Sequence, residues 1–408
     1  MKRVDSVDVL RALALIGMVL CHYPIYLSSS EGPEPMVYFL ANHALGGDFA
    51  ASWFVFLVGV SQVLSARKRA GELASDTGRV LLRGTAIFVM GLLFLLLVQG
   101  YEELWVWDIL TFIGAATVVL LFCRLLSSRA LLLICTAVTA ITPWLRSRVD
   151  LAALYGGAFV NVRWISDYLP NFLFDPVQDY QGAPTFLGNV LGFFLTGQFP
   201  ILPWIVFPIV GFVIGRRLAE NRLADDSPFL MLIGGLLTFT GLFTAWAGSQ
   251  HPPFDVAGGY LAPLSFYPQS FSMGLFLLGV VLILFTALWN RFDRRPAPDA
   301  PPGLFMRYCR LFSRYSLTIY ITHFALFFIP LRLIRFMGGP DYFHDLTSPT
   351  VALGLAVGLL ILYYPVLTLW DRFNGRFSFE WILARVLAPF SRPALPPGQG
   401  SAVRLPAK

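Results

Sequence analysis

The sequence predicts an all-α polytopic membrane protein with about ten transmembrane helices. Of the 408 residues, 56% are hydrophobic and 13% are charged, and the mean hydropathy of +0.67 exceeds what a soluble fold of this length could bury. Apolar runs of about 18 residues also recur along the chain, which is typical of membrane helices. Finally, the lysines and arginines gather in short connections on one predicted side of the membrane.

The first apolar run covers residues 7–27, and Asp5 or Ser6 before it is expected to cap the helix. No small-x-small cleavage site follows the run, so we expect a span and not a cleaved signal peptide. Residues 187–199 are apolar but too short to span, which predicts a re-entrant segment and leaves room for an eleventh helix. The other nine spans are expected at about 49–66, 84–100, 107–124, 129–145, 201–215, 228–247, 270–289, 315–334 and 350–370.

The distribution of positive charge predicts the orientation of these spans. With both termini inside, 25 of the 30 lysines and arginines fall on the inner side, and the other five are Arg146, Arg148, Arg163, Arg332 and Arg335. Both termini are therefore expected in the cytoplasm, and for a bacterial protein the membrane would be the inner (plasma) membrane. Residues 1–375 should form one transmembrane domain, and residues 376–408 a cytoplasmic amphipathic helix near 377–390 and a disordered tail.

Charge and cysteine content exclude several classes of protein. A net charge of +6 does not indicate nucleic-acid binding here, because the positive charge lies in short loops where the orientation of the spans explains it. The chain has no P-loop, dinucleotide fingerprint, HExxH motif or clear internal repeat. The four cysteines show neither a disulfide framework nor metal-ligand spacing, so no metal is expected; they are Cys21, Cys123, Cys135 and Cys309.

Two ionisable residues, Arg11 and His22, lie in the first span. Eleven residues are about three helical turns, which places both side chains on nearly the same face, roughly 16 Å apart. A guanidinium suits a phosphate, and a histidine suits general-base work, so coenzyme A could lie along this helix with its phosphates at Arg11 and its thioester at His22. An alternative stays open, in which Arg11 reaches the headgroups and pairs with Asp8 while His22 is an interfacial histidine.

Three further positions are candidates. His43 lies with Asn42 and Asp48 where the chain re-enters the membrane, although a histidine in an outer loop is more often an ordinary polar surface residue. Asp108 opens a span, where it either complements the helix dipole or orients a histidine. His323 is intramembrane, and it is either a core histidine bonded to a neighbouring helix or part of a site. These alternatives are not separated by the residues alone.

Loops contribute the remaining candidates. The outer segment 146–186 is rich in Tyr, Trp, Asn and Asp, and it is either a sugar-facing platform or a belt of interfacial aromatics. Trp164 and Asp179 represent it here as substrate-binding candidates. His251 and His344 are expected to be ordinary loop residues. The basic inner connections offer Arg67, Lys68, Arg69, Arg79 and Arg83 for phosphate binding.

The chain also resembles a known family. RVDSVDVLRALALIGMVLCHYP resembles the first helix of the transmembrane acyltransferase superfamily, and Arg11 and His22 match the Arg-x10-His feature of its acyltransferase-three branch. A second resemblance is to the heparan-α-glucosaminide N-acetyltransferase branch. It is carried by SVDVLRALA followed by NHALGG-D and WFVFLVG, and by residues 197–216. Residues 314–327 resemble the late helix of both branches. The resemblance runs from about residue 3 to 370 and is most specific in the first 60 residues.

This resemblance implies acyl transfer across a membrane, from cytoplasmic acyl-CoA to a glycan hydroxyl or amine outside. In the glucosaminide branch an asparagine is typical at the position of His22, and the histidine at the position of His43 is the catalytic candidate. The present chain has both histidines. Which of the two acts as the base, and whether the acceptor is an amine or a hydroxyl, therefore stays open.

The resulting hypothesis is a membrane acyltransferase that moves an acyl group, expected to be acetyl, from acetyl-CoA or another acyl-CoA to an extracytoplasmic sugar or glycan. Its partners would be these substrates and the bilayer, with no nucleic acid and no metal, and a homodimer is one option for its assembly. A transporter or exporter of a small anionic or lipid-linked solute, and a non-catalytic scaffold or sensor, are the alternatives. The expected residues are His43, His22, Asp108 and His323 for catalysis, Arg11, Arg67, Lys68, Arg69 and Arg83 for the coenzyme, and Asn42, Asp48, Trp164 and Asp179 for the acceptor.

Overall fold

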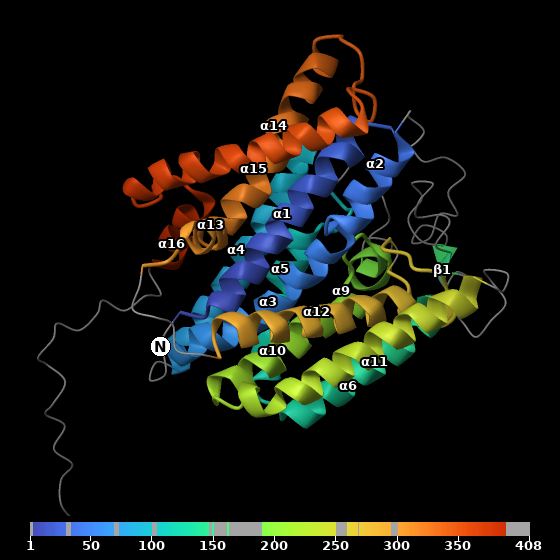
Figure 1. Cartoon of the computed structure of the whole chain (residues 1–408), viewed down its shortest axis with the longest axis vertical. Helices are drawn as coiled ribbons and strands as arrows, with labels where there is room; N and C mark the ends of the chain where they lie inside the picture. The colour runs from blue at the N-terminus through green and yellow to red at the C-terminus, as the bar shows by residue number, and fades with distance from the viewer. Residues whose placement is uncertain are drawn as a thin grey trace, which may run out of the picture.

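The fold is a bundle of long helices, which confirms the all-α polytopic class (Figure 1). The structure is a computed structural model. Within its described part, nine helical segments are long and apolar enough to cross a membrane, and the shorter apolar helix Ile109–Cys123 joins them. The described residues are 3–29, 34–68, 73–99, 104–146, 149–150, 161–162, 190–249, 259–267, 269–294 and 301–388.

Most helices follow the predicted spans closely, but α4 begins at Leu73, well before the predicted start at residue 84. The first half of the chain forms α1 (Asp5–Leu27), α2 (Pro35–Phe39), the π-helical turn η1 (Leu40–Ala44), α3 (Gly47–Lys68), α4 (Leu73–Phe94), η2 (Leu95–Gln99), α5 (Ile109–Cys123) and α6 (Ser128–Arg146). Two-residue strands β1 (Val149–Asp150) and β2 (Asn161–Val162) pair antiparallel. The second half forms η4 (Gly192–Thr196), α9 (Ile201–Trp204), α10 (Val206–Ala219), α11 (Leu223–Ser249), α12 (Phe271–Phe292), α13 (Leu304–Arg314), α14 (Ser316–Phe336), α15 (Pro349–Arg372) and α16 (Phe379–Leu387).

Helix α1 lies in the middle of the bundle (Figure 1). It contacts α3, α12, α13, α14, α15 and η1. Its apolar residues are spread around the helix, and 61% of its most apolar window is buried, against 17% for α11. A helix that is apolar on all sides can lie in the core or face lipid, and these values place α1 in the core and α11 at the lipid-facing edge.

Glycines allow α3 and α10 to approach backbone to backbone. A Cβ at Gly59 of α3 would lie 1.9 Å from the Pro208 carbonyl oxygen, and a Cβ at Gly211 of α10 would lie 2.0 Å from the Phe56 carbonyl oxygen. Small residues at such crossings are typical of membrane helices, because packing and not the hydrophobic effect joins helices in lipid. This contact holds α3, which carries several residues of the candidate site.

The predicted cap of α1 was wrong. The N-cap residue is Val4, and neither Asp5 nor Ser6 caps the helix with its own side chain. Instead the carboxylate of Asp293, at the end of α12, accepts hydrogen bonds from the backbone N–H groups of Asp5 and Ser6 at 2.8 Å each. Arg310 of α13 then pairs with Asp5. We call this end of the bundle, where α1 begins, the inner end.

The segment predicted at 187–199 does not form a separate span in its described part. Residues 192–196 make the turn η4, and the chain continues into α9 and α10, so that Gly192–Ala219 is one candidate span of 28 residues. The buried Arg146 side chain fixes this broken helix by donating hydrogen bonds to the carbonyls of Leu195 and Leu202. Backbone groups released by the break are thus satisfied inside the protein, as a membrane requires.

Candidate functional site

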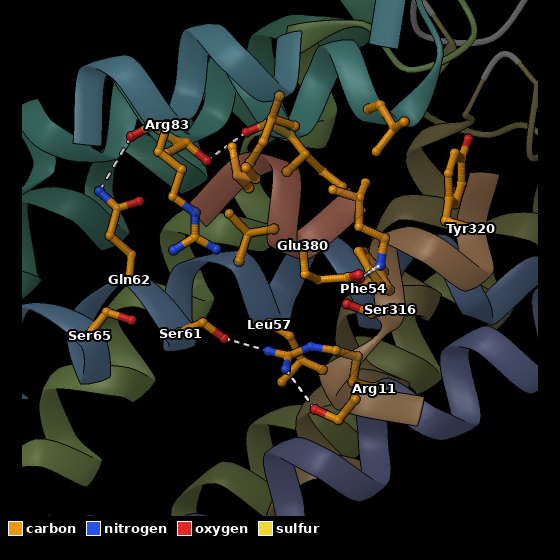
Figure 2. A pocket seen from close by; sticks show the side chains of 18 of the residues that line it. Arg11, Phe54, Leu57, Ser61, Gln62, Ser65, Arg83, Ser316, Tyr320 and Glu380 are labelled. Atoms are coloured by element: carbon orange, nitrogen blue, oxygen red, sulfur yellow. Dashed lines mark hydrogen bonds between the residues drawn. The ribbon is translucent and has the colours of Figure 1, made fainter. Parts of the chain in front are cut away.

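A basic cavity of about 290 Å³ lies toward the inner end of the bundle. Residues of α1, α3, α4, α5, α13, α14 and α16 line it. Polar side chains on the α3 wall are Ser61, Gln62 and Ser65, as Figure 2 shows. Four arginines and one carboxylate, Glu380, line the cavity, and Arg314 is paired with Asp371; the arginines are Arg11, Arg79, Arg83 and Arg314.

Arg11 is held in the cavity wall by neutral hydroxyl groups. Its guanidinium donates to the Ser313 hydroxyl at 2.8 Å and to the Ser61 hydroxyl at 2.7 Å (Figure 2). The alternative of an Arg11–Asp8 hydrogen-bonded pair was wrong, because Asp8 bonds to Arg3 instead. Serine partners fix the position of the guanidinium without neutralising it, so its charge is directed into the cavity.

The other basic residues divide into two groups. Arg83 and Arg79 of α4 line the cavity together with Arg11. The side chain of Arg67 is exposed and does not belong to this lining. The side chain of Lys68 and the whole of Arg69 lie outside the described residues.

Tyr320 of α14 lines the deep end of the cavity. Its hydroxyl donates to the Asp108 carboxylate at 2.6 Å. The same carboxylate accepts from the backbone N–H of Leu110 at 3.3 Å and so caps α5. Asp108 therefore caps a helix as one alternative expected, and its side-chain partner in the described structure is a tyrosine and not a histidine.

His22 and His323 form a hydrogen-bonded pair. The two ring planes are stacked with centroids 5.2 Å apart, and His22 Nδ1 lies 2.9 Å from His323 Nε2. His323 Nδ1 lies 3.1 Å from the Ile319 carbonyl oxygen, so this nitrogen must carry the proton. His323 Nε2 then accepts from His22 Nδ1–H, which leaves the lone pair of neutral His22 on its Nε2 atom. Tyr320 contacts the His323 ring edge-on, so the pair adjoins the deep end of the cavity.

His43 lies on the turn η1 and pairs with Asp48 at the start of α3. Its Nδ1 donates to the Asp48 carboxylate at 2.6 Å, and half of the His43 side chain is exposed. The ring also lies against Phe39, at a centroid distance of 4.7 Å. Asn42 beside it is buried, and its side-chain oxygen has no hydrogen-bond partner. An imidazole held at Nδ1 by a carboxylate presents its Nε2 as a base, which is the arrangement of a catalytic histidine.

The two histidine pairs lie on different sides of α1. Gly17 of α1 meets Gly46, since a Cβ at Gly17 would lie 2.9 Å from the Gly46 carbonyl oxygen. Gly47 meets Cys21, one helical turn further along α1. The loop that carries His43 therefore packs on the face of Gly17 and Cys21, whereas the next residue, His22, turns toward α14.

The remaining candidates do not join these groups. Trp164, Asp179 and His251 lie outside the described residues. His344 Nδ1 donates to the Ile25 carbonyl oxygen at 2.7 Å and so fastens a loop to the end of α1. Sequence reasoning missed Ser61, Ser313, Arg314 and Glu380 as cavity residues; only Arg314, which directly precedes a span, carried a signal that could have marked it.

The sequence of this chain matches a known family. The sequence profile described as heparan-alpha-glucosaminide N-acetyltransferase, catalytic, matches residues 3–244, more than half of the chain. The chain belongs to this family. The match favours a membrane N-acetyltransferase over the transporter and scaffold alternatives, and it covers α1 to α10 and most of α11, including both Arg11 and His43. No curated protein matches the chain.

Proposed function

We propose that this heparan-alpha-glucosaminide N-acetyltransferase family member transfers an acetyl group from acetyl-CoA to an amine or hydroxyl of an extracytoplasmic sugar. The bilayer concerned would be a bacterial inner membrane, with both termini in the cytoplasm. The observation that carries the proposal is the arrangement along α1. A cationic cavity lies at its inner end, and two histidine pairs lie about three turns further along.

The cavity suits the nucleotide part of coenzyme A. Phosphates are recognised by guanidinium groups, which form charge-assisted hydrogen bonds, and Arg11, Arg83 and Arg314 lie around one volume. The pantetheine arm would extend past Tyr320 toward His323 and His22. In this proposal an inner donor and an outer acceptor meet near the middle of the bundle.

His43 is the base in this proposal. Asp48 holds Nδ1–H, so Nε2 takes a proton from the acceptor amine or hydroxyl as that atom attacks the thioester carbonyl carbon. The carbon–sulfur bond then breaks, and the coenzyme leaves as a thiolate that takes up a proton. The exposure of His43 supports contact with an acceptor that arrives from outside.

His22 and His323 lie on a different side of α1 from His43, so they form a second place at which the thioester could bind. His22 Nε2 is the atom that carries the lone pair, so it offers a second base, or an acceptor for a proton released during transfer. Asn42 and Asp48 would contact the acceptor near His43. Trp164 and Asp179 remain predicted acceptor contacts from the outer loop.

The proposal is tested with the purified chain in lipid nanodiscs, with acetyl-CoA as donor and glucosamine as acceptor probe. Release of coenzyme A thiol is followed with a chromogenic disulfide, to which the four buried native cysteines contribute little. His43→Ala should lower turnover by about 10²-fold or more, with His251→Ala as the histidine control. If His43→Ala and His22→Ala both kept wild-type turnover, the proposed chemistry would be wrong.

A further inference from the structure

One carboxylate reaches into the described lining of the basic cavity, and it belongs to α16. Glu380 Oε1 accepts from the backbone N–H groups of Leu317 at 2.7 Å and Thr318 at 3.0 Å. Glu380 Oε2 accepts from the Thr318 hydroxyl at 2.5 Å. The carboxylate thus sits on the N-terminus of α14, where exposed N–H groups and the helix dipole favour an anion.

This position is one that a phosphate could take. Three donors converge on the Glu380 oxygens, and Arg11 and Arg314 line the same cavity. Figure 2 shows Glu380, Arg11 and Arg83 around one space. A helix N-terminus beside guanidinium groups binds phosphate by the same contacts that bind a carboxylate, so Glu380 stands in for an anionic ligand.

Helix α16 also forms one wall of the cavity. Leu383 and Leu387 line it together with Glu380, and α16 packs against α4 and α14. The cavity of about 290 Å³ is at the lower limit of roughly 300–1,000 Å³ that small-molecule sites occupy. A nucleotide with a pantetheine arm needs more room than this, and an outward movement of α16 would supply it.

The connection between α15 and α16 is a short turn, in which the Trp370 Nε1–H donates to the Arg376 carbonyl oxygen at 2.7 Å. Asn374, Gly375 and Phe377 all have positive φ angles, which makes residues 373–378 a tight turn distinct from both helices. The turn is anchored on the α15 side, where Asp371 accepts from the Tyr315 hydroxyl at 2.8 Å. Burial and this bond raise the pKa of Tyr315 to about 12, so the hydroxyl stays a donor at neutral pH.

We propose that α16 is a lid on the basic cavity and that Glu380 is its internal ligand, bound where a phosphate of the donor binds. The proposal rests on the proposed function, since it takes coenzyme A as the ligand. A donor phosphate displaces the Glu380 carboxylate from the N–H groups of Leu317 and Thr318, and α16 turns away about residues 373–378. Until then the lid competes with the donor.

The first experiment measures binding of coenzyme A to the full chain in nanodiscs by calorimetry. Glu380→Gln keeps an oxygen that caps α14 but removes the competing charge, and it should bind coenzyme A about tenfold more tightly than wild type. Ser270→Ala is the matched control, because it removes the side-chain cap of α12 away from the cavity and should leave the affinity unchanged. Equal or weaker binding by Glu380→Gln would overturn the lid.

A second experiment follows the lid with the wild-type glutamate in place. Leu387, the last residue of α16, is buried, so Leu387→Cys should react slowly with a maleimide, and several-fold faster once acetyl-CoA is added, whose acetylated sulfur does not consume the maleimide. The native cysteines are buried and give a low background. A rate that acetyl-CoA does not change would show that α16 is a fixed wall.

Arg83→Ala separates this proposal from the proposed function. If coenzyme A binds wild type and Arg83→Ala weakens that binding, the donor assignment holds. An affinity of Glu380→Gln equal to that of wild type would then overturn the lid alone. If neither wild type nor Glu380→Gln binds coenzyme A, the donor assignment is wrong and the lid is wrong with it.

Discussion

The two ends of the site are built in opposite ways. At the inner end, charged side chains border an open volume, and Arg11 is held by two serine hydroxyls. Toward the outer end, the histidines are paired and packed, with His22 against His323 and the Phe324 ring. Space suits the recognition of a flexible charged ligand, whereas fixed hydrogen bonds set which imidazole nitrogen carries a lone pair. Ligand binding and proton transfer thus require different degrees of side-chain order.

The largest expected effect tests the packed end. Asp48→Asn should lower turnover by about 10²-fold or more, since an amide no longer holds the His43 tautomer or stabilises its imidazolium. The apparent affinity for acetyl-CoA should change little, because Asp48 lies outside the cavity lining. The measurement is steady-state kinetics with coenzyme A release. A large rise in the donor KM instead would mean that Asp48 takes part in donor binding, which would contradict the assignment of donor binding to the inner end.

A smaller effect is expected at the open end, and it should appear in the donor KM and not in the turnover number. Arg11→Ala should raise the donor KM by about 10- to 100-fold, since a charge-assisted phosphate contact is lost, while kcat changes less. Arg67→Ala is the control, because this exposed arginine does not line the cavity. Equal effects of the two substitutions would mean that general positive charge, and not the cavity, recruits the donor.

The boundary between the two ends is tested at His323. His323→Ala removes the acceptor that fixes the His22 tautomer, and kcat should fall by about tenfold with little change in KM. His323→Gln offers a side-chain oxygen to His22 Nδ1 and should recover part of the loss. Because His323 is buried, thermal unfolding of both variants is measured alongside. If kcat fell equally in both variants and in proportion to the fall in unfolding temperature, His323 would be a packing residue.

Much of this fold could be predicted from hydropathy alone, because membrane helices must satisfy their own backbone hydrogen bonds over a fixed length. The predicted spans at 7–27 and 270–289 nearly coincide with α1 and α12. Contacts across the chain could not be predicted in this way. Asp293 caps α1 from 287 or more residues away, and hydropathy contains no signal for such a partner.

In the candidate site, too, contacts between residues close in sequence could be predicted and contacts between distant residues could not. His43 and Asp48 are five residues apart, so their clustering was visible in the sequence, and the structure pairs them. The pairing of His22 with His323 joins positions 301 residues apart and needed the bundle geometry. Glu380 looked like part of a separate tail segment, because its role depends on the N-terminus of α14 lying beside α16.

The smallest expected effect concerns how neutral partners hold a charge at the open end. Ser61→Ala and Ser313→Ala each remove one hydroxyl from the Arg11 guanidinium but no charge from the cavity. Each should raise the donor KM by about threefold, and the double variant by about tenfold, because a less well positioned guanidinium still attracts a phosphate. Ser65→Ala is the matched control, since Ser65 lines the cavity on the same helix as Ser61, and the described hydrogen bonds of Arg11 go to Ser61 and Ser313 instead. Effects as large as that of Arg11→Ala would mean that the open end depends on fixed geometry as strictly as the histidine pairs do.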